Sequence, residues 1–233
     1  MGLLAFIPAR AGSKSIPHKN ITLINGKPLV QYTMEAALQS SGIDSIFVST
    51  DDPAVVQIAN GLGIEVPYQR PQRLAQDDTP MVDTVLHGLE WLRTNCGNRP
   101  EAVMLLQPTS PLRNADDIQG AINQFQKTDA DSLVSVHEMN EHPYECIRDK
   151  GRSWTYLAKS DVPSYRRQDY KKTFYYINGA MYLCRVAFLE LKKTLIQEGE
   201  TAVYIMPAER GIDVDTDYDL LRCEQFLEYD DNR

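Results

Sequence analysis

The sequence contains no apolar run near the roughly 20 residues that a membrane-spanning helix requires, so we expect no membrane partner. Its first eight residues lack a basic stretch, and Pro8 comes too early for the apolar core of a secretory signal. Cysteines are few and scattered, and none of the four belongs to a C-x-x-C pair. This spacing argues against zinc and favours the reduced setting of the cytoplasm.

Positive charge is also scarce. The chain has 24 Lys and Arg against 32 Asp and Glu, which gives a formal net charge of −8 at pH 7. A field of that sign does not favour nucleic acid as a partner. It is compatible with a small anionic substrate where cations gather locally and a divalent metal assists.

What the sequence does have is enough apolar content for a sizeable core, with 42% hydrophobic residues in 233. Short apolar runs typical of buried strands alternate with helical patterns. Predicted strands are 3–7, 45–49, 64–66, 102–106, 132–136 and 202–206, with a strand–turn–strand unit over 174–184. Predicted helices are 28–39, 53–62, 79–94, 115–125, 186–196 and 216–228. The alternation predicts an α/β fold with a mostly parallel sheet covered on both sides, in a single domain over residues 1–233.

Residues 139–173 interrupt this alternation. The pairs His142-Pro143 and Val162-Pro163 and a basic-polar stretch break both the helical and the strand period. Because the segment has little apolar content of its own, we interpret it as an excursion from the sheet and not as a second domain.

The loop after the first strand, P-A-R-A-G-S-K-S-I-P-H-K-N, carries the strongest chemical signal. A loop at the carboxyl end of a parallel strand faces the crevice where open α/β sheets bind ligands. Arg10, Lys14 and Lys19 bring three cations there, while Gly12 and Ser13 let backbone N–H groups approach phosphate oxygens. The spacing is not that of a Walker loop. A solvated basic turn is the alternative, and we favour phosphate binding.

A second signal is the run G-I-D-V-D-T-D-Y-D before the last predicted helix. In an extended chain Asp213 and Asp215 point to one face and the aliphatic residues beside them to the other. Two carboxylates on one face suit Mg²⁺. Capping of the helix is the alternative, but Thr216 and Asp217 are the better capping residues, which leaves the first two acids for a metal.

Weaker patterns follow other strands. The turn L-L-Q-P-T-S-P-L-R presents Gln107 and Arg113, which suit contacts to a base or a sugar but equally suit a rigid turn. Arg70 follows the third predicted strand. Arg166 and Arg167 belong to a charge run, which is more often a solvated face.

These patterns occur together in one family. The loop I-P-A-R-A-G-S-K-S-I-P-H-K-N closely resembles the nucleotide-binding signature of the CMP-sialic acid synthetase (acylneuraminate cytidylyltransferase) family. L-L-Q-P-T-S-P-L-R, I-N-G-A-M-Y and D-V-D-T-D-Y-D-L match further blocks of that family in the same order. Four ordered blocks that cover the chain nearly end to end are far more specific than any one of them.

The resemblance implies a Rossmann-like fold of the nucleotidyltransferase type A kind and an Mg²⁺-dependent reaction. The anomeric hydroxyl of a nine-carbon α-keto acid sugar, of the N-acetylneuraminate or legionaminate type, attacks the α-phosphate of CTP and releases pyrophosphate. The expected catalytic residues are Arg10, Lys14, Asp213 and Asp215. The expected nucleotide-binding residues are Arg10, Gly12, Ser13, Lys14, Lys19, Asn20 and Arg70. The expected substrate-binding residues are Gln107, Arg166, Arg167 and Asn178, and the expected Mg²⁺ ligands are Asp213 and Asp215.

The resemblance further implies that residues 139–173 form a dimerisation arm, inserted after about residue 138, which reaches toward the other subunit's active site in a homodimer. One departure is Glu145, which follows H-P-Y where sialic acid synthetases tend to have a lysine. The run H-P-Y-E-C is more like the legionaminic acid branch, so we expect a related nonulosonic acid as substrate.

Two other functions stay open. A catalytically silent nucleotide-sugar-binding or regulatory protein would share the fold, but the joint presence of the loop cations and the two aspartates favours catalysis. A glycosyltransferase that consumes a nucleotide sugar would not need the basic first loop.

Overall fold

The computed structural model describes residues 2–159, 169–170 and 172–231. The strands are β1 Leu3–Ala9, β2 Leu23–Ile24, β3 Lys27–Pro28, β4 Ser45–Thr50, β5 Ala102–Leu105, β6 Ser132–Glu138, β7 Ile147–Asp149, β8 Trp154–Tyr156, β9 Tyr175–Arg185 and β10 Thr201–Ile205. The helices are α1 Leu29–Gln39, α2 Pro53–Gly61, α3 Met81–Asn95, α4 Ala115–Gln126, α5 Val186–Lys192 and α6 Asp217–Asp231, with short 3-10 turns η1 Lys19–Ile21, η2 Gln72–Leu74 and η4 Ala208–Gly211. Over these ranges, no helix is both long and apolar enough to cross a membrane.

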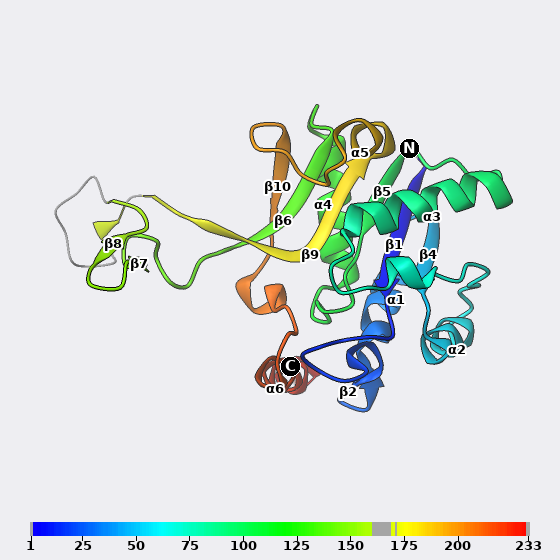
Figure 1. Ribbon diagram of the computed structural model, residues 1–233, viewed down its shortest axis with the longest axis horizontal. Helices are drawn as coiled ribbons and strands as arrows, with labels where there is room; N and C mark the ends of the chain where they lie inside the picture. The colour runs from blue at the N-terminus through cyan, green and yellow to red at the C-terminus, as the bar shows by residue number, and fades with distance from the viewer. Residues whose placement is uncertain (1, 160–168, 171, 232–233) are drawn as a thin grey trace.

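The centre of the fold is a six-stranded sheet with the order β10-β6-β9-β5-β1-β4 (Figure 1). β1 is parallel to β4 and β5, and β10 is parallel to β6. β9 is antiparallel to both of its neighbours, β5 and β6. The predicted α/β class with a mostly parallel sheet is therefore confirmed.

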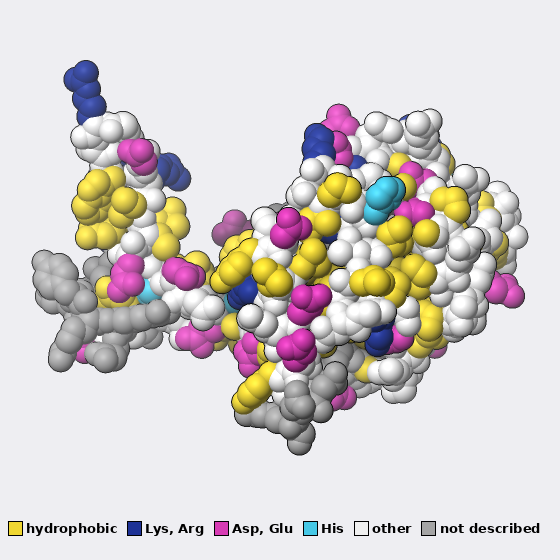
Figure 2. All heavy atoms as spheres, turned by 90° about the horizontal axis from the view of Figure 1, so that it is seen from below, with side chains coloured by type: hydrophobic (Ala, Val, Ile, Leu, Met, Phe, Trp, Pro, Cys, Tyr) yellow, Lys and Arg dark blue, Asp and Glu magenta, His cyan; other side chains and the backbone are white. Residues whose placement is uncertain are grey.

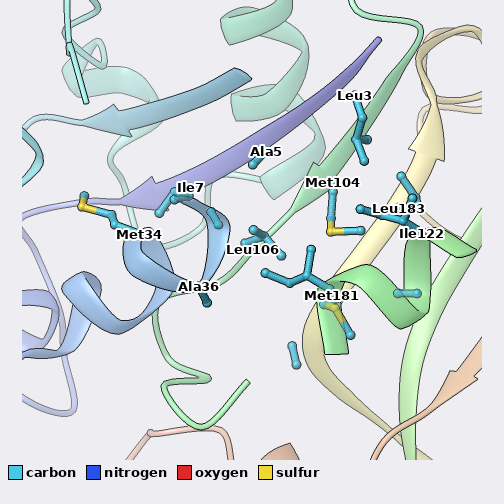
Figure 3. Packing of buried hydrophobic residues seen from close by; sticks show 14 of the residues in the cluster. Leu3, Ala5, Ile7, Met34, Ala36, Met104, Leu106, Ile122, Met181 and Leu183 are labelled. Atoms are coloured by element: carbon cyan, nitrogen blue, oxygen red, sulfur yellow. The ribbon is translucent and has the colours of Figure 1, made fainter. Parts of the chain in front are cut away.

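Both faces of the sheet are covered, and β1 shows how the sequence achieves this. Leu3, Ala5 and Ile7 pack toward α1 and α4 in one apolar cluster (Figure 3). Leu4 and Phe6 point the other way, into a second cluster with α3 and α5. Since successive side chains of a strand face opposite sides, only a continuous apolar run can fill both clusters.

Polar side chains fix where helices begin. The carboxylate of Asp52 accepts a hydrogen bond from the Ala54 N–H at 2.9 Å, with Pro53 as the first helical residue of α2, as the sequence predicts. Asn114 and Asp117 form a reciprocal capping box at the start of α4. These caps satisfy N–H groups that a helix leaves unpaired at its first turn.

Three predicted elements differ in the structure. Residues 64–66 form no strand: the Ile64 N–H bonds to the Ala59 carbonyl at the end of α2, and the segment pairs with no strand of the sheet. The segment predicted as strand–turn–strand around Asn178-Gly179 is one strand, β9, whose pairing with β6 shifts register between Val134 and Val136. Gly179 has φ of 75°, so the Asn-Gly pair produces an irregularity in the strand instead of a reversal. α5 ends at Lys192, earlier than predicted, because the next residue is left-handed.

The excursion from the sheet is evident in Figure 1, where the β7–β8 hairpin stands away from the body at the end of a long stalk. Part of that stalk is the first half of β9. Where the stalk meets the hairpin, just before β7 and β9 along the chain, four rings pack together at centroid distances of 4.4 to 5.4 Å. They belong to His142, Tyr144, Tyr170 and Phe174. Within residues 139–159 the chain leaves the central sheet and forms the β7–β8 hairpin, as an excursion would. Residues 160–168 and 171 lie outside the described residues, and the role of the whole segment in dimerisation stays a prediction.

Close packing of α3 on the sheet yields a stability prediction. A Cβ at Gly88 would lie 2.6 Å from Phe6 and 2.8 Å from Phe47 side-chain atoms. We expect Gly88→Ala to lower the free energy of unfolding by about 1–3 kcal/mol, because a close-packed core resists an added methyl group. The matched control is Gly61→Ala at the end of α2, where nothing lies within 4 Å of the new methyl group and stability should not fall. Urea unfolding of the two variants measures the difference; equal midpoints would contradict the packing argument.

Candidate active site

A cleft of about 300 Å³ opens at the carboxyl ends of β1 and β5. The strand order changes direction here, since the chain passes from β1 to β4 on one side and later returns to β5 on the other. Open α/β sheets bind their ligands at such a switch point. The cleft is lined by Pro8, Arg10, Gly12, Ser13, Lys14, Ser15, Lys19, Asn20, Arg70, Met81, Gln107, Pro108, Thr109 and Asp215. All seven predicted nucleotide-binding residues therefore share one cavity.

The first loop is held in shape by polar contacts of its backbone. The Asn20 amide donates to the Arg10 carbonyl at 2.9 Å, and the Ala11 N–H donates to an Asp51 carboxylate oxygen at 2.9 Å. The side chains of Arg10 and Lys14 both form ion pairs with Asp77, at 2.5 and 2.8 Å. The loop thus presents its cations from a fixed backbone.

Lys19 joins the first loop to the acidic segment near the C-terminus. Its ammonium donates to the Val214 carbonyl and to the Asp215 carboxylate, both at 2.9 Å. Beneath this contact, Ile16, Ile212 and Val214 belong to a third buried apolar cluster. The contact places the two strongest sequence motifs side by side, although 196 positions separate the paired residues.

The acidic segment has the alternation that its sequence predicts. Ile212 and Val214 are buried, whereas Asp213 and Asp215 are exposed. The start of α6 is capped by Thr216 together with Asp219, whose carboxylate accepts from the Thr216 N–H at 2.9 Å. Capping therefore does not use Asp213 or Asp215.

Electrostatics distinguishes these two carboxylates. Asp215 is compensated by Lys19, as described above. Although the Asp213 residue as a whole is exposed, the protein around its carboxyl partly desolvates that group and raises its pKa. A hydrogen bond with Thr109 opposes this effect, and the nearby negative charge of Asp215 adds to it. A positive charge beside Asp213 would oppose both effects and lower the pKa of its carboxyl.

The carboxylates of Asp213 and Asp215 fit a hard cation that takes its remaining ligands from water or a bound phosphate. Nowhere in the described part of the chain do three or more His, Cys, Asp or Glu side chains gather in a metal-binding arrangement. Two aspartates are nevertheless enough for Mg²⁺, which prefers oxygen and commonly takes one or two carboxylates with waters and substrate phosphates. Asp213 and Asp215 are the residues here that could hold it.

Arg70 lines the cleft although it is a buried cation, only 4% exposed. Its guanidinium donates to the hydroxyl and the carbonyl of Ser49 at 2.9 and 2.6 Å. Burial lowers the pKa of Arg70 to about 10, and the Asp51 carboxylate opposes that shift. Arg70 therefore stays protonated at neutral pH and adds positive charge to the cleft.

The predicted substrate-binding residues are not all brought together. Gln107 lines the cleft and donates to the Gly179 carbonyl at 3.2 Å. A Cβ at Gly179 would lie 3.4 Å from Gln107 Nε2 and 3.9 Å from Asp213 Oδ2, so both side chains approach the same side of this glycine. Asn178 is only 2% exposed, and its side-chain oxygen accepts from Ser135 Oγ at 2.6 Å. That carboxamide oxygen is engaged inside the protein, which limits what Asn178 offers to a ligand. Arg166 and Arg167 lie outside the described residues.

Arg113, in the turn between β5 and α4, has a structural environment. It is fully buried and donates to the Ala180 carbonyl at 2.7 Å and to the Thr33 hydroxyl at 2.6 Å. For this residue the rigid-turn alternative holds.

Sequence reasoning missed Asp77, Ser15 and Met81. Ser15 and Met81 line the cleft, and Asp77 pairs with two of its cations. Ser15 could have been predicted from the sequence, since it belongs to the first loop, whose other polar residues line the cleft. Asp77 and Met81 follow no predicted strand and stand in no motif, so only the tertiary structure reveals them.

Comparison with known proteins agrees with this geometry. The family described as Cytidylyltransferase matches residues 4–221. CMP-N,N'-diacetyllegionaminic acid synthase of Legionella pneumophila is 34% identical over 98% of this chain and 97% of its own length. N-acylneuraminate cytidylyltransferase of Streptococcus agalactiae is 34% identical over 97% of this chain, which spans about half (54%) of that longer relative. Pseudaminic acid cytidylyltransferase of Campylobacter jejuni is 30% identical over 93% of this chain and 92% of its own.

Solved structures show the same fold. CMP:2-keto-3-deoxy-manno-octonic acid synthetase complexed with CTP has a TM-score of 0.71 at 20% identity, with 99% of this chain and 100% of that chain covered. 4-Diphosphocytidyl-2C-methyl-D-erythritol synthase of Anaerococcus prevotii has a TM-score of 0.68 at 13% identity, with 97% and 98% covered. The nucleotidyltransferase-like fold expected from the resemblance is thereby confirmed. Since the family match covers nearly the whole chain and three relatives reach 30% identity or more, the chain belongs to the cytidylyltransferase family of nucleotidyltransferases.

Proposed function

We propose that the protein transfers CMP from CTP to the anomeric hydroxyl of a nine-carbon α-keto acid sugar, with Mg²⁺ as cofactor. The observation that carries this proposal is the Lys19 contact, which brings the cations of the first loop and Asp215 of the C-terminal segment to one cleft. Cations and carboxylates at the same end of a sheet suit a triphosphate with its metal.

The reaction forms a bond between the sugar oxygen and the α-phosphorus of CTP and breaks the bond to the β-phosphate. Pyrophosphate leaves, and the hydroxyl proton is released. Arg10, Lys14 and Lys19 bind the triphosphate and neutralise charge that grows on the leaving group. Gly12 and Ser13 line the same cleft, where their backbone N–H groups would approach phosphate oxygens. No covalent partner is needed, because positioning and charge neutralisation account for most of phosphoryl-transfer catalysis.

Asp213 and Asp215 would hold the Mg²⁺. When bound, the ion neutralises phosphate charge and lowers the pKa of a coordinated hydroxyl. The contribution of the chain itself is to keep both carboxylates on one face: the burial of Ile212 and Val214 fixes the direction of the segment.

For the acceptor we propose a nonulosonic acid of the legionaminate type, with N-acetylneuraminate and pseudaminate as the closest alternatives. The H-P-Y-E-C run supports the legionaminate type, and the sugars in the names of the three relatives support a nonulosonic acid. Gln107 stands between the cleft and Gly179, where it would contact the sugar. Arg166, Arg167 and Asn178 remain the proposed residues for the sugar or its carboxylate, with Asn178 acting through its buried network.

The decisive test is pyrophosphate release from CTP and Mg²⁺ with diacetyllegionaminate, N-acetylneuraminate and pseudaminate supplied in parallel. We expect release with diacetyllegionaminate to exceed that with the other two. Preference for another of the three would correct the acceptor only. CTP binding without release from any sugar would favour the silent nucleotide-sugar-binding alternative.

Removal of one metal ligand gives a second prediction. Asp215→Ala should lower kcat by about 100-fold or more, as expected when a catalytic ion loses a carboxylate. The fold should persist, because the Asp215 side chain is 68% exposed. Asp217→Ala, two residues along and equally exposed to solvent, is the matched control and should keep wild-type turnover. Rates measured over a titration of Mg²⁺ decide: near-normal activity of Asp215→Ala at limiting Mg²⁺ would refute the metal assignment.

We also propose that residues 139–173 join two copies into a homodimer, which works in the cytoplasm. Large apolar side chains of the arm stand exposed on the hairpin and just beyond it, and Figure 2 shows such a cluster projecting from the body. They are Ile147, Trp154, Tyr156 and Leu157. An exposed apolar patch of this kind typically marks an interaction surface, and no helix within residues 2–159 and 172–231 could cross a membrane, so we favour a protein interface. The four cysteines are free thiols, in keeping with a reducing compartment.

The dimer proposal predicts that Trp154→Glu shifts the protein toward a monomer. A charge in an apolar interface lacks a partner and disfavours association. Sedimentation velocity measures the shift, with Arg152→Glu at an exposed position of the same hairpin as the control. A wild-type protein that sediments as a monomer at micromolar concentration would contradict the proposal.

A further inference from the structure

Asp77 stands out because one carboxylate pairs with two cations of the cleft. One of its oxygens lies 2.5 Å from Arg10 Nη1 and the other lies 2.8 Å from Lys14 Nζ. Arg10 and Lys14 line the cleft, whereas Asp77 belongs to the segment between η2 and α3 and contributes no lining atom. Asp77 is exposed, and its carboxylate contacts the two cations from outside the set of residues that line the cleft.

The hydrogen bonds of Arg10 show which of its donors remain for a ligand. Its Nη1 donates to the Ala75 carbonyl at 3.2 Å as well as pairing with Asp77. Both hydrogens of that nitrogen are therefore engaged by residues 75–77. A guanidinium has five donors in a fixed plane, so Nε and Nη2 keep three for a phosphate. The anchoring of one edge of the guanidinium sets the direction in which the other edge points.

Lys14 depends on Asp77 still more. Its side chain is 80% exposed, and Asp77 is its ion-pair partner among the described residues. A lysine side chain free in solvent samples many rotamers, and each must be given up when a ligand binds. The Asp77 contact holds the ammonium beside the Arg10 guanidinium before any ligand arrives.

We infer that Asp77 is a positioning residue of the nucleotide site, which orients Arg10 and Lys14 together toward the phosphates of CTP. The inference rests on the proposed function and adds a residue to it. We expect Asp77 to contact neither nucleotide nor sugar and to act only through Arg10 and Lys14. The same two contacts lower the pKa of Asp77, so the carboxylate is ionised at neutral pH.

The sign of the effect separates positioning from simple electrostatics. Loss of a negative charge beside an anion site should by itself tighten anion binding. Loss of a positioning group should weaken it. Asp77→Asn removes the negative charge and the positioning contacts together. We expect the loss of positioning to have the larger effect, so anion binding should weaken. Asp78→Asn removes the same charge one residue further along, where no ion pair is formed within the described residues, and serves as the matched control.

Calorimetric titration with inorganic pyrophosphate and with CTP, without sugar, provides the direct measurement. Asp77→Asn should weaken both by about three- to tenfold, the range expected when two part-exposed ion pairs are lost. Asp78→Asn should bind as wild type or slightly more tightly. In turnover, kcat/KM for CTP should fall by at least a similar factor, because Arg10 and Lys14 also neutralise charge on the leaving pyrophosphate, while the KM for the sugar stays within about twofold of wild type.

A double-mutant comparison tests whether Asp77 acts through Lys14. In a Lys14→Ala background, Asp77→Asn should cost less than it does alone, because one of its two partners is already absent. Asp77→Glu restores the charge and should recover part of the affinity. Thermal unfolding of each variant checks the fold, which an exposed residue should leave intact.

These measurements distinguish a failure of the Asp77 positioning role from a failure of the proposed function. If the wild type turns over but Asp77→Asn binds pyrophosphate as tightly as Asp78→Asn, or more tightly, the positioning role is overturned and the proposed function stands. If the wild type binds neither CTP nor pyrophosphate, the proposed function fails and the role of Asp77 falls with it.

Discussion

The burial of β1 on both faces is the constraint from which the rest of the fold follows. A strand that is apolar on every residue has to lie in the interior of a sheet with helices on both sides. β1 accordingly lies between β4 and β5, and its carboxyl end falls where the strand order changes direction. The first loop emerges there, so the position of the nucleotide cleft is set by the packing of Leu3 to Ala9 before any polar contact forms.

Charge in the cleft is balanced locally in a protein that is acidic overall. Four cations, Arg10, Lys14, Lys19 and Arg70, face or line the cavity, while Asp51, Asp77 and Asp215 neutralise part of their charge. Such pairing keeps the loop ordered without a ligand and leaves a net positive wall for phosphate. The net charge of −8 therefore says little about this site, because Coulomb energies depend on the nearest groups.

Local physics made much of this structure predictable from sequence. The apolar run of β1, the Asp52 cap and the alternation of Asp213 with its aliphatic neighbours each depend on residues within a few positions of one another. The first loop could be assigned to the cleft because strand ends of parallel sheets share an edge.

Features that depend on partners distant in the chain could not be predicted. The pairing of Lys19 with Asp215 and of Lys14 with Asp77 needs the folded topology, since no local pattern links those residues. The Asn178-Gly179 pair predicts a turn from local sequence alone, whereas pairing with β5 and β6 on its two sides keeps the segment in one strand. The burial of Asn178 likewise depends on Ser135 in a neighbouring strand.

β9 has a mechanical consequence. Its second half is clamped between β5 and β6 in the sheet, and its first half leaves the body as part of the stalk (Figure 1). The direction of the arm is therefore set by β9, whose second half is fixed in the sheet and contacts Gln107 through Gly179. Changes of length at the tip of the hairpin alter its reach and leave the cleft alone. A one-residue insertion within β9 would instead turn every later side chain of the strand to the opposite face of the sheet.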